Sequence, residues 1–254
     1  MTFYQANACS LLISHSKYRD KMNITDIAIE PLPFTIEVAE TESLLHSALA
    51  VRQAAYARHN PEVGTLLQNA EIEDSIAGSL VLIARSKTDA RTLGSMRIHT
   101  NAFLPLPLEK YTALPSGIAG RRLAEATRLG IMPHPLGPAV RTALFKAFYL
   151  HCVQQEVDFM VITSARSLYR MYKQMTFMDI DPAADYRSMP HSGTLPLRAM
   201  YLEVRESERA WGEARHPLFT FMFKTIHEDI NVTSAASLRA AAAVPVPLST
   251  TDSP

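Results

Sequence analysis

Cysteine, tryptophan and long apolar runs are scarce in this sequence. Among its 254 residues are two cysteines and one tryptophan. Cys9 and Cys152 lie far apart in the chain and show no zinc-site spacing, which argues against a disulfide framework and for buried thiols in a reducing compartment. No apolar run approaches the roughly 18 residues that a membrane-spanning helix requires. The first residues carry a basic stretch after an apolar one, the reverse of a secretory signal, so we expect a cytoplasmic protein.

An excess of either charge is also absent. Lys and Arg together number 25, as do Asp and Glu, so the formal net charge is zero. A neutral chain lacks the basic patch that attracts nucleic acid or an anionic membrane surface. We therefore expect a small-molecule or protein partner and no nucleic acid. Hydrophobic residues make up 47% of the chain, which is ample for the buried core of one domain.

The composition divides the chain into three parts. Residues 1–30 show no sustained period and are expected to form a flexible N-terminal arm. Residues 31–232 carry the alternating pattern of a folded domain. Residues 233–254 are rich in Ala, Pro, Ser and Thr, the composition of a disordered C-terminal tail.

Strand and helix patterns alternate within the central part. Period-two or buried apolar runs predict strands at 34–40, 79–86, 91–100, the beginning of 124–139, 158–165 and 197–204. Helical spacing predicts helices at 42–59, 139–157 and 166–177, with Gly137 and Pro138 at the start of the second. One helical turn is expected near "LEKY". This order predicts a mixed α/β fold in which helices flank a central mixed sheet.

The stretch "AEATRLGIMPHPLGPA" (124–139) places Glu125 and Arg128 in an otherwise apolar strand. Residues three apart on a regular strand point to opposite faces, so Arg128 would be a structural residue on the far face. A β-bulge between them would bring both to one face, and bulges are frequent beside active sites. The two charges line a cleft only if the strand is bulged.

The strand, loop and helix of this region resemble the core of the GNAT acyltransferase superfamily. Its pyrophosphate loop follows the pattern Arg/Gln-x-x-Gly-x-Gly/Ala, and residues 134–139 read "HPLGPA". The resemblance implies an acyl-donor loop containing Ile131, His134, Gly137 and Ala139, with backbone N–H groups at a helix start. Because histidine replaces the leading Arg/Gln, we expect weak binding of the coenzyme A pyrophosphate. The alternative for the whole segment is a strand-to-helix turn that is stiffened by proline and binds no acyl donor.

A narrower resemblance joins the chain to acyl-homoserine-lactone autoinducer synthases and FeeM-like N-acyl amino acid synthases. The shared motifs are "VRQAAYARH" with Arg52, "EIEDS" with Glu73 and Asp74, "GSMR" with Arg97, and "EATR" with Glu125 and Arg128. Autoinducer synthases carry a tryptophan after the first helix, whereas the one tryptophan here is Trp211. This difference favours the FeeM-like branch.

The resemblance implies transfer of a long fatty acyl group from an acyl carrier protein to the α-amine of an amino acid. The donor would be the carrier's phosphopantetheine thioester, or acyl-CoA, with no permanently bound cofactor and no metal. Partners would be the acyl carrier protein and the amino acid, with membrane contact only through the lipid product. An autoinducer synthase and a non-catalytic acyl-binding protein are the alternatives.

Glu125 is the candidate general base, because an amine must be neutral to attack a thioester and burial raises a carboxylate's pKa. Arg52, Asp74, Arg97 and Arg128 are the candidate substrate-binding residues, since a guanidinium matches the two oxygens of a carboxylate. The alternative for Glu125 is a structural ion pair with Arg97 or Arg128.

Two tyrosines of the helix at 166–177, Tyr169 and Tyr172, are candidate general acids toward the leaving thiolate, with core packing as the alternative. A late helix at 216–230 would roof an acyl tunnel. The residues expected to line that tunnel, if they are not ordinary core, are Leu144, Phe145, Phe148, Tyr149, Met160, Phe219 and Met222.

Overall fold

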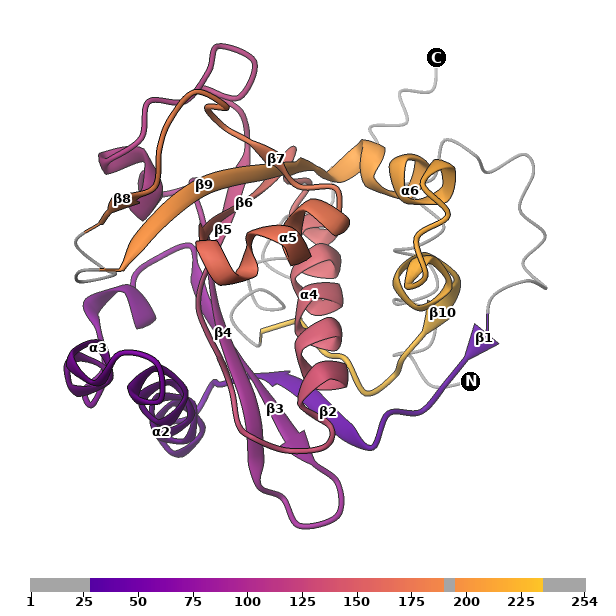
Figure 1. The fold of residues 1–254 in the computed structure, drawn as a ribbon. Helices are drawn as coiled ribbons and strands as arrows, with labels where there is room; N and C mark the ends of the chain where they lie inside the picture. Colours follow the sequence, from indigo (N-terminus) through magenta and orange to yellow (C-terminus); the bar gives the residue numbers. More distant parts are fainter. Residues whose placement is uncertain (1–27, 190–194, 235–254) are drawn as a thin grey trace, which may run out of the picture.

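The computed structural model of the chain describes residues 28–189 and 195–234 (Figure 1). Most of the expected arm at 1–30 and of the expected tail at 233–254 therefore lies outside the described residues. In the described ranges no helix combines the length and the apolar character needed to cross a bilayer.

The strands are β1 (Ala28–Ile29), β2 (Phe34–Val38), β3 (Ser79–Ser86), β4 (Thr92–Thr100), β5 (Leu123–Ile131), β6 (Phe159–Ala165), β7 (Met178–Asp179), β8 (Arg187–Ser188), β9 (Pro196–Glu203) and β10 (Thr225–Ile226). The helices are α2 (Glu42–Ala57), α3 (Pro61–Leu66), α4 (Gly137–Gln154), α5 (Arg166–Gln174) and α6 (Val204–Glu213). Short helical turns are η2 (Ile72–Asp74), η3 (Pro107–Lys110) and the π-type η5 (Thr220–Lys224). The mixed sheet flanked by helices confirms the expected fold class.

The main sheet has the order β2-β3-β4-β5-β6-β9-β7, with β8 paired to β9. β5 and β6 are parallel, and the main sheet's other described pairs are antiparallel. The register joins β5 to β6 only from Leu123↔Phe159 to Ala126↔Ile162. Beyond Ala126 and Ile162 the two strands continue without pairing to each other, so their C-terminal halves separate in the middle of the sheet.

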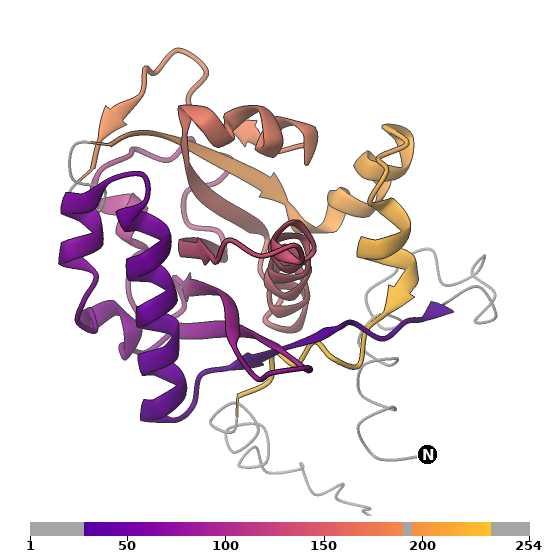
Figure 2. The same ribbon diagram turned by 60° about the horizontal axis from the view of Figure 1, so that its bottom comes forward.

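Helices cover both faces of the sheet. Figure 2, in which α4 is seen nearly end-on, shows α2 and α3 on one side and α4 on the other. α2 lies close to β5, because a Cβ on Gly130 would come within 3.2 Å of the Arg52 Cα. α4 begins at Gly137 with a proline in its first positions, as the sequence predicts. The side chains of α2 therefore reach the part of β5 that follows its pairing with β6.

The prediction of a late helix at 216–230 is wrong. That segment forms the π turn η5, then β10, and then a turn closed by the hydrogen bond from the Ile230 N–H to the His227 carbonyl, after which Ile230 bridges to Ile36 of β2. Lys146 of α4 holds the turn, since its Nζ donates to the carbonyl oxygens of Phe221 (2.6 Å) and Thr225 (2.5 Å). These carbonyls are therefore bound by a side chain from another element and do not continue a helical ladder.

The sequence analysis also missed α6. Its Trp211 is 1% exposed, and the indole Nε1 donates to the carbonyl oxygen of Met175 at 3.1 Å. α6 and η5 together cover the end of the large core cluster beside α4.

Candidate active site

β5 contains the bulge on which the roles of Glu125 and Arg128 depend. Ser95 of β4 pairs with Gly130, and Arg97 pairs with Thr127. Two residues of β5, Arg128 and Leu129, therefore stand opposite one residue of β4. Arg128 has a φ of 54°, in the left-handed region that a side chain other than glycine seldom adopts. Such strain persists only where the surroundings hold it.

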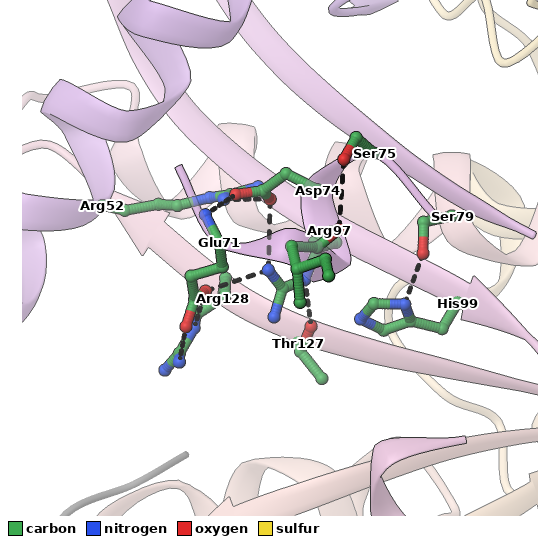
Figure 3. A network of polar contacts seen from close by, with 10 residues as sticks. Arg52, Glu71, Asp74, Ser75, Ser79, Arg97, His99, Thr127 and Arg128 are labelled. Carbon is green, nitrogen blue, oxygen red and sulfur yellow. Dashed lines mark hydrogen bonds and ion pairs between the residues drawn. The ribbon is translucent and has the colours of Figure 1, made fainter. Parts of the chain in front are cut away.

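The bulge brings the Arg128 guanidinium to the α2 face of the sheet. Arg97 shares that face with its partner Thr127, to whose hydroxyl its Nε donates at 3.1 Å. Glu125 lies two residues before Thr127 and so points the same way. Arg128 and Arg97 both bind one carboxylate, Glu71 (Figure 3).

Three arginines and two carboxylates form one buried network (Figure 3). Arg128 donates to Glu71 through Nε (2.7 Å) and Nη2, in a forked pair. Arg97 donates through Nη1 to Glu71 (2.9 Å) and to Asp74 (3.1 Å). Arg52 donates to the same Asp74 oxygen at 2.6 Å. Among the described residues the network contains three cations and two anions.

The arginines keep both carboxylates ionised. Burial alone would raise the pKa of Glu71, but Arg128 and then Arg97 outweigh it and hold that pKa below its ordinary value. Burial opposes ionisation of Asp74 in the same way, and Arg52 and Arg97 lower its pKa. Arg52 and Asp74 have side chains 0% and 1% exposed, whereas Glu71 is 22% exposed. Glu71 is thus the carboxylate of the network that faces the outside.

Glu125 lies beside this network but forms none of its ion pairs. Its side chain is fully buried beneath η3, where Oε2 accepts the Leu108 backbone N–H at 3.0 Å. Oε1 has no hydrogen-bond partner among the described residues. Burial raises the pKa of Glu125 to about 7, against the opposing effects of the Leu108 N–H and of Arg97. A carboxyl group with such a pKa can take up and release a proton near neutral pH.

The expected acyl-donor loop packs on itself. His134 Nδ1 accepts the Leu136 N–H at 3.1 Å, and the His134 carbonyl accepts the Gly137 N–H at 2.8 Å. A Cβ on Gly137 would meet Ile131 Cγ2 at 3.3 Å, which explains a glycine at this close approach. Ala139 is exposed on the first turn of α4. His134 therefore stabilises the turn, and its imidazole Nδ1 is occupied.

The two candidate tyrosines have different surroundings. The Tyr169 hydroxyl donates to Asp179 Oδ2 of β7 at 2.8 Å. Tyr172 is 5% exposed and packs edge-on against Phe145 and Phe177. Burial raises the pKa of Tyr172, and the nearby phenol of Tyr56 adds to the effect. Tyr172 is thus the candidate nearer to the arginines.

Glu71 and Tyr56 are site residues that the sequence reasoning missed. Both lie inside motifs quoted for the resemblance, "EIEDS" and "VRQAAYARH". Glu73 of the first motif takes no part in the network as described. Tyr56 lies one helical turn after Arg52, and its pKa, raised by burial, also responds to the charges of Arg128, Arg52 and Arg97. Residues four apart on a helix share one face, so the spacing between Arg52 and Tyr56 is the sequence signal that could have identified Tyr56.

Comparisons with known proteins agree with this geometry. Residues 47–203 match the family described as N-acyl amino acid synthase FeeM, and this span includes all of the network. The chain belongs to the FeeM family. No curated protein sequence matches this FeeM-family chain.

Two solved structures show the fold of this FeeM-family protein. FeeM, an N-acyl amino acid synthase from uncultured soil microbes, is 16% identical with a TM-score of 0.56, covering 74% of this chain and 98% of FeeM. BjaI, a CoA-dependent acyl-homoserine lactone synthase solved with SAM and isopentyl-CoA, is 12% identical with a TM-score of 0.52, covering 82% of this chain and 98% of BjaI. The family match identifies the chain as an N-acyltransferase.

Proposed function

We propose that this protein transfers a fatty acyl group from an acyl carrier protein thioester to the α-amine of an amino acid. The observation that carries the proposal is Glu125, a fully buried carboxyl group whose pKa burial raises to about 7. At neutral pH an amino acid's ammonium must lose a proton before it attacks. A base with this pKa accelerates such a step by about 10²–10⁴-fold.

Arg128 and Arg97 are suited to hold the amino acid's carboxylate. Arg128 already binds the Glu71 carboxylate through two nitrogens, which is the geometry a substrate carboxylate requires. Arg52 and Asp74 are enclosed, so in this proposal they hold Arg97 in place and do not themselves contact the substrate.

The thioester would lie where β5 and β6 part. A small apolar pocket on the α4 side is lined by residues that include Phe145, Tyr149, Met160 and Met222. Phe145, Tyr149, Met160 and Met222 are among the residues expected to line an acyl tunnel, whereas the expected Leu144 and Phe148 do not line this pocket. Phe145, Met160 and Met222 also belong to the large core cluster. Because Met160 is the β6 neighbour of Ala124, an acyl chain in this pocket would end close to Glu125 on the other face. Methionines adapt their shape, so the pocket can widen around a chain.

The loop favours a carrier-protein thioester as donor. An acyl-CoA must bind its adenosine diphosphate part, and the GNAT pattern uses a leading Arg or Gln in the loop. His134 stands there, and its Nδ1 is bonded inside the turn. A carrier-protein donor needs only the pantetheine arm to be bound.

The test is incubation of the purified chain with dodecanoyl carrier protein or dodecanoyl-CoA, an amino acid mixture and SAM. Mass spectrometry should find N-acyl amino acids, formed faster from the carrier protein, and Glu125→Gln should lose most of the turnover. An acyl-homoserine lactone as the product would replace the proposal by an autoinducer synthase. Absence of any amide or lactone with either donor would leave an acyl-binding protein.

A further inference from the structure

Glu125 has no direct route to solvent for the proton that it takes up. Its side chain is 0% exposed and η3 covers it. A general base must lose its proton before the next substrate arrives. A fully enclosed base therefore needs neighbouring groups that can carry the proton outward.

Such groups lie in one row across the sheet. Glu125 of β5 is the Cα partner of His99 of β4, and His99 is the partner of Ser79 of β3. Facing side chains on antiparallel strands have Cβ atoms about 4.5–5.5 Å apart, so the three side chains are neighbours on the α2 face. His99 is 2% exposed and Ser79 is half-buried. The row therefore leads from the buried carboxyl group of Glu125, through the buried His99, to Ser79 of β3, which is partly exposed to solvent.

The polar atoms of the row complement each other. Ser79 Oγ and His99 Nδ1 are 2.5 Å apart (Figure 3). On the inner side, His99 Nε2 and Glu125 Oε1 are both buried and have no hydrogen-bond partner among the described residues. Two unpartnered buried polar atoms on facing residues are costly unless a proton, a water molecule or a substrate group joins them.

We propose that His99 and Ser79 form a proton relay that discharges Glu125 between turnovers. Protonated Glu125 gives its proton to His99 Nε2, directly or through one water molecule. His99 Nδ1 passes its own proton to Ser79 Oγ, and the Ser79 hydroxyl proton moves to solvent water. The carboxylate is restored, and the imidazole has exchanged one neutral tautomer for the other. The first tautomer returns when Nε2 passes its proton to a water molecule that enters the site as the product leaves, while Nδ1 takes a proton from solvent through the Ser79 hydroxyl. The proposal rests on Glu125 being the base.

The surroundings keep the imidazole neutral, as the relay requires. Burial and then the charge of Arg97 lower the pKa of His99 to about 3. The neighbouring charges that affect the pKa of His99 are those of Arg97, Asp74, Arg52 and Glu71. The charges that affect the pKa of Glu125 are those of Arg97 and of Glu109 in η3. A neutral imidazole has one donor and one acceptor nitrogen, so it can receive a proton on one side while it releases one on the other.

Pre-steady-state kinetics of Ser79→Ala and His99→Gln tests the relay. Loss of the relay slows recovery of the base but not the first attack. We expect single-turnover amide formation at the wild-type rate, followed by a steady-state kcat reduced about tenfold or more, so that a burst of one product per enzyme appears. The matched control is Ser95→Ala, which removes a buried hydroxyl from the same face of β4 outside the row and should show no burst.

The outcomes separate the relay from the proposed function. An unchanged steady-state kcat in both relay variants overturns the relay, and so does an equal loss in the first turnover, which would make His99 a group that only orients Glu125. Glu125→Gln is measured in the same series. If that variant keeps the wild-type first turnover, Glu125 is not the base and the relay has no proton to discharge, whereas absence of amide from the wild-type protein would refute the proposed function.

Discussion

Replacing Glu125 by glutamine should change how the stability of the protein depends on pH. Burial raises the pKa of Glu125 from its ordinary value of 4.5 to about 7. Between these two pH values the folded protein holds a proton that the unfolded chain has released. The free energy of unfolding of the wild type therefore falls as the pH rises from about 4.5 to about 7, and the loss persists above that window.

The magnitude follows from the two pKa values. One pKa unit corresponds to about 1.4 kcal/mol, so the loss reaches about 3 kcal/mol by pH 8. Glu125→Gln keeps an oxygen that can accept the Leu108 N–H and carries no titrating group. We therefore compare the free energy of unfolding of Glu125→Gln with that of the wild type at each pH. The variant minus wild-type difference should be about 3 kcal/mol more positive at pH 8 than at pH 4.5.

Urea titration at pH 4.5, 6, 7 and 8 measures this difference. Trp211 is the one tryptophan of the chain and is buried, so its fluorescence reports unfolding of the domain. The control is Glu62→Gln, which changes an exposed carboxylate on α3. Its free energy of unfolding should depend on pH in the same way as that of the wild type. A constant difference between Glu125→Gln and the wild type at all four pH values would refute the raised pKa and remove the main support for Glu125 as the base.

Three further predictions concern packing, substrate binding and donor length. Gly64→Ala should lower the free energy of unfolding measured in urea by about 1–3 kcal/mol, because its new Cβ would lie 2.7 Å from the Ala57 Cα. The control is Gly117→Ala, whose Cβ would meet no atom within 4 Å and which should have no effect; equal effects of the two variants would contradict the packing argument. Arg128→Lys should raise KM for the amino acid about tenfold with little change in kcat, because lysine cannot form the forked pair; a fall in kcat alone would place Arg128 elsewhere in the reaction. Each buried methylene contributes about 0.8 kcal/mol, so lengthening the acyl donor by four carbons should raise kcat/KM by up to about 200-fold, and Met222→Trp should suppress that gain; a flat profile from acetyl to tetradecanoyl would exclude a long-chain pocket.

Local patterns were enough to predict most of the elements. The strands at 79–86 and 92–100 follow from apolar and β-branched runs bounded by a turn, and the start of α4 follows from Gly137 and Pro138. These signals act over a few residues, so they hold wherever the segment lies in the fold. The segment at 216–230 is the counterexample, since the Lys146 side chain and strand pairing with β1 override its apparent helical pattern.

The acidic motif "EIEDS" shows the same limit at the site. The sequence indicates that carboxylates gather there, but Glu71 and Asp74 bind the arginines while Glu73, between them, does not. Which carboxylate faces an arginine depends on how η2 sits over β4 and β5. That placement is set by contacts between segments far apart in the chain.

The sequence by itself determined the order of the main strands and helices between residues 34 and 203, the proline-started helix after the candidate strand, and the family motifs that single out Glu125, Arg97 and Arg128. Only the tertiary structure decided that Arg128 joins the face of Glu125, because the bulge appears in the register between β4 and β5 and in a positive φ, neither of which leaves a local pattern. The raised pKa of Glu125 is likewise a tertiary property. It arises from the removal of water by η3 and the strands around it, and an isolated strand would leave that carboxylate solvated.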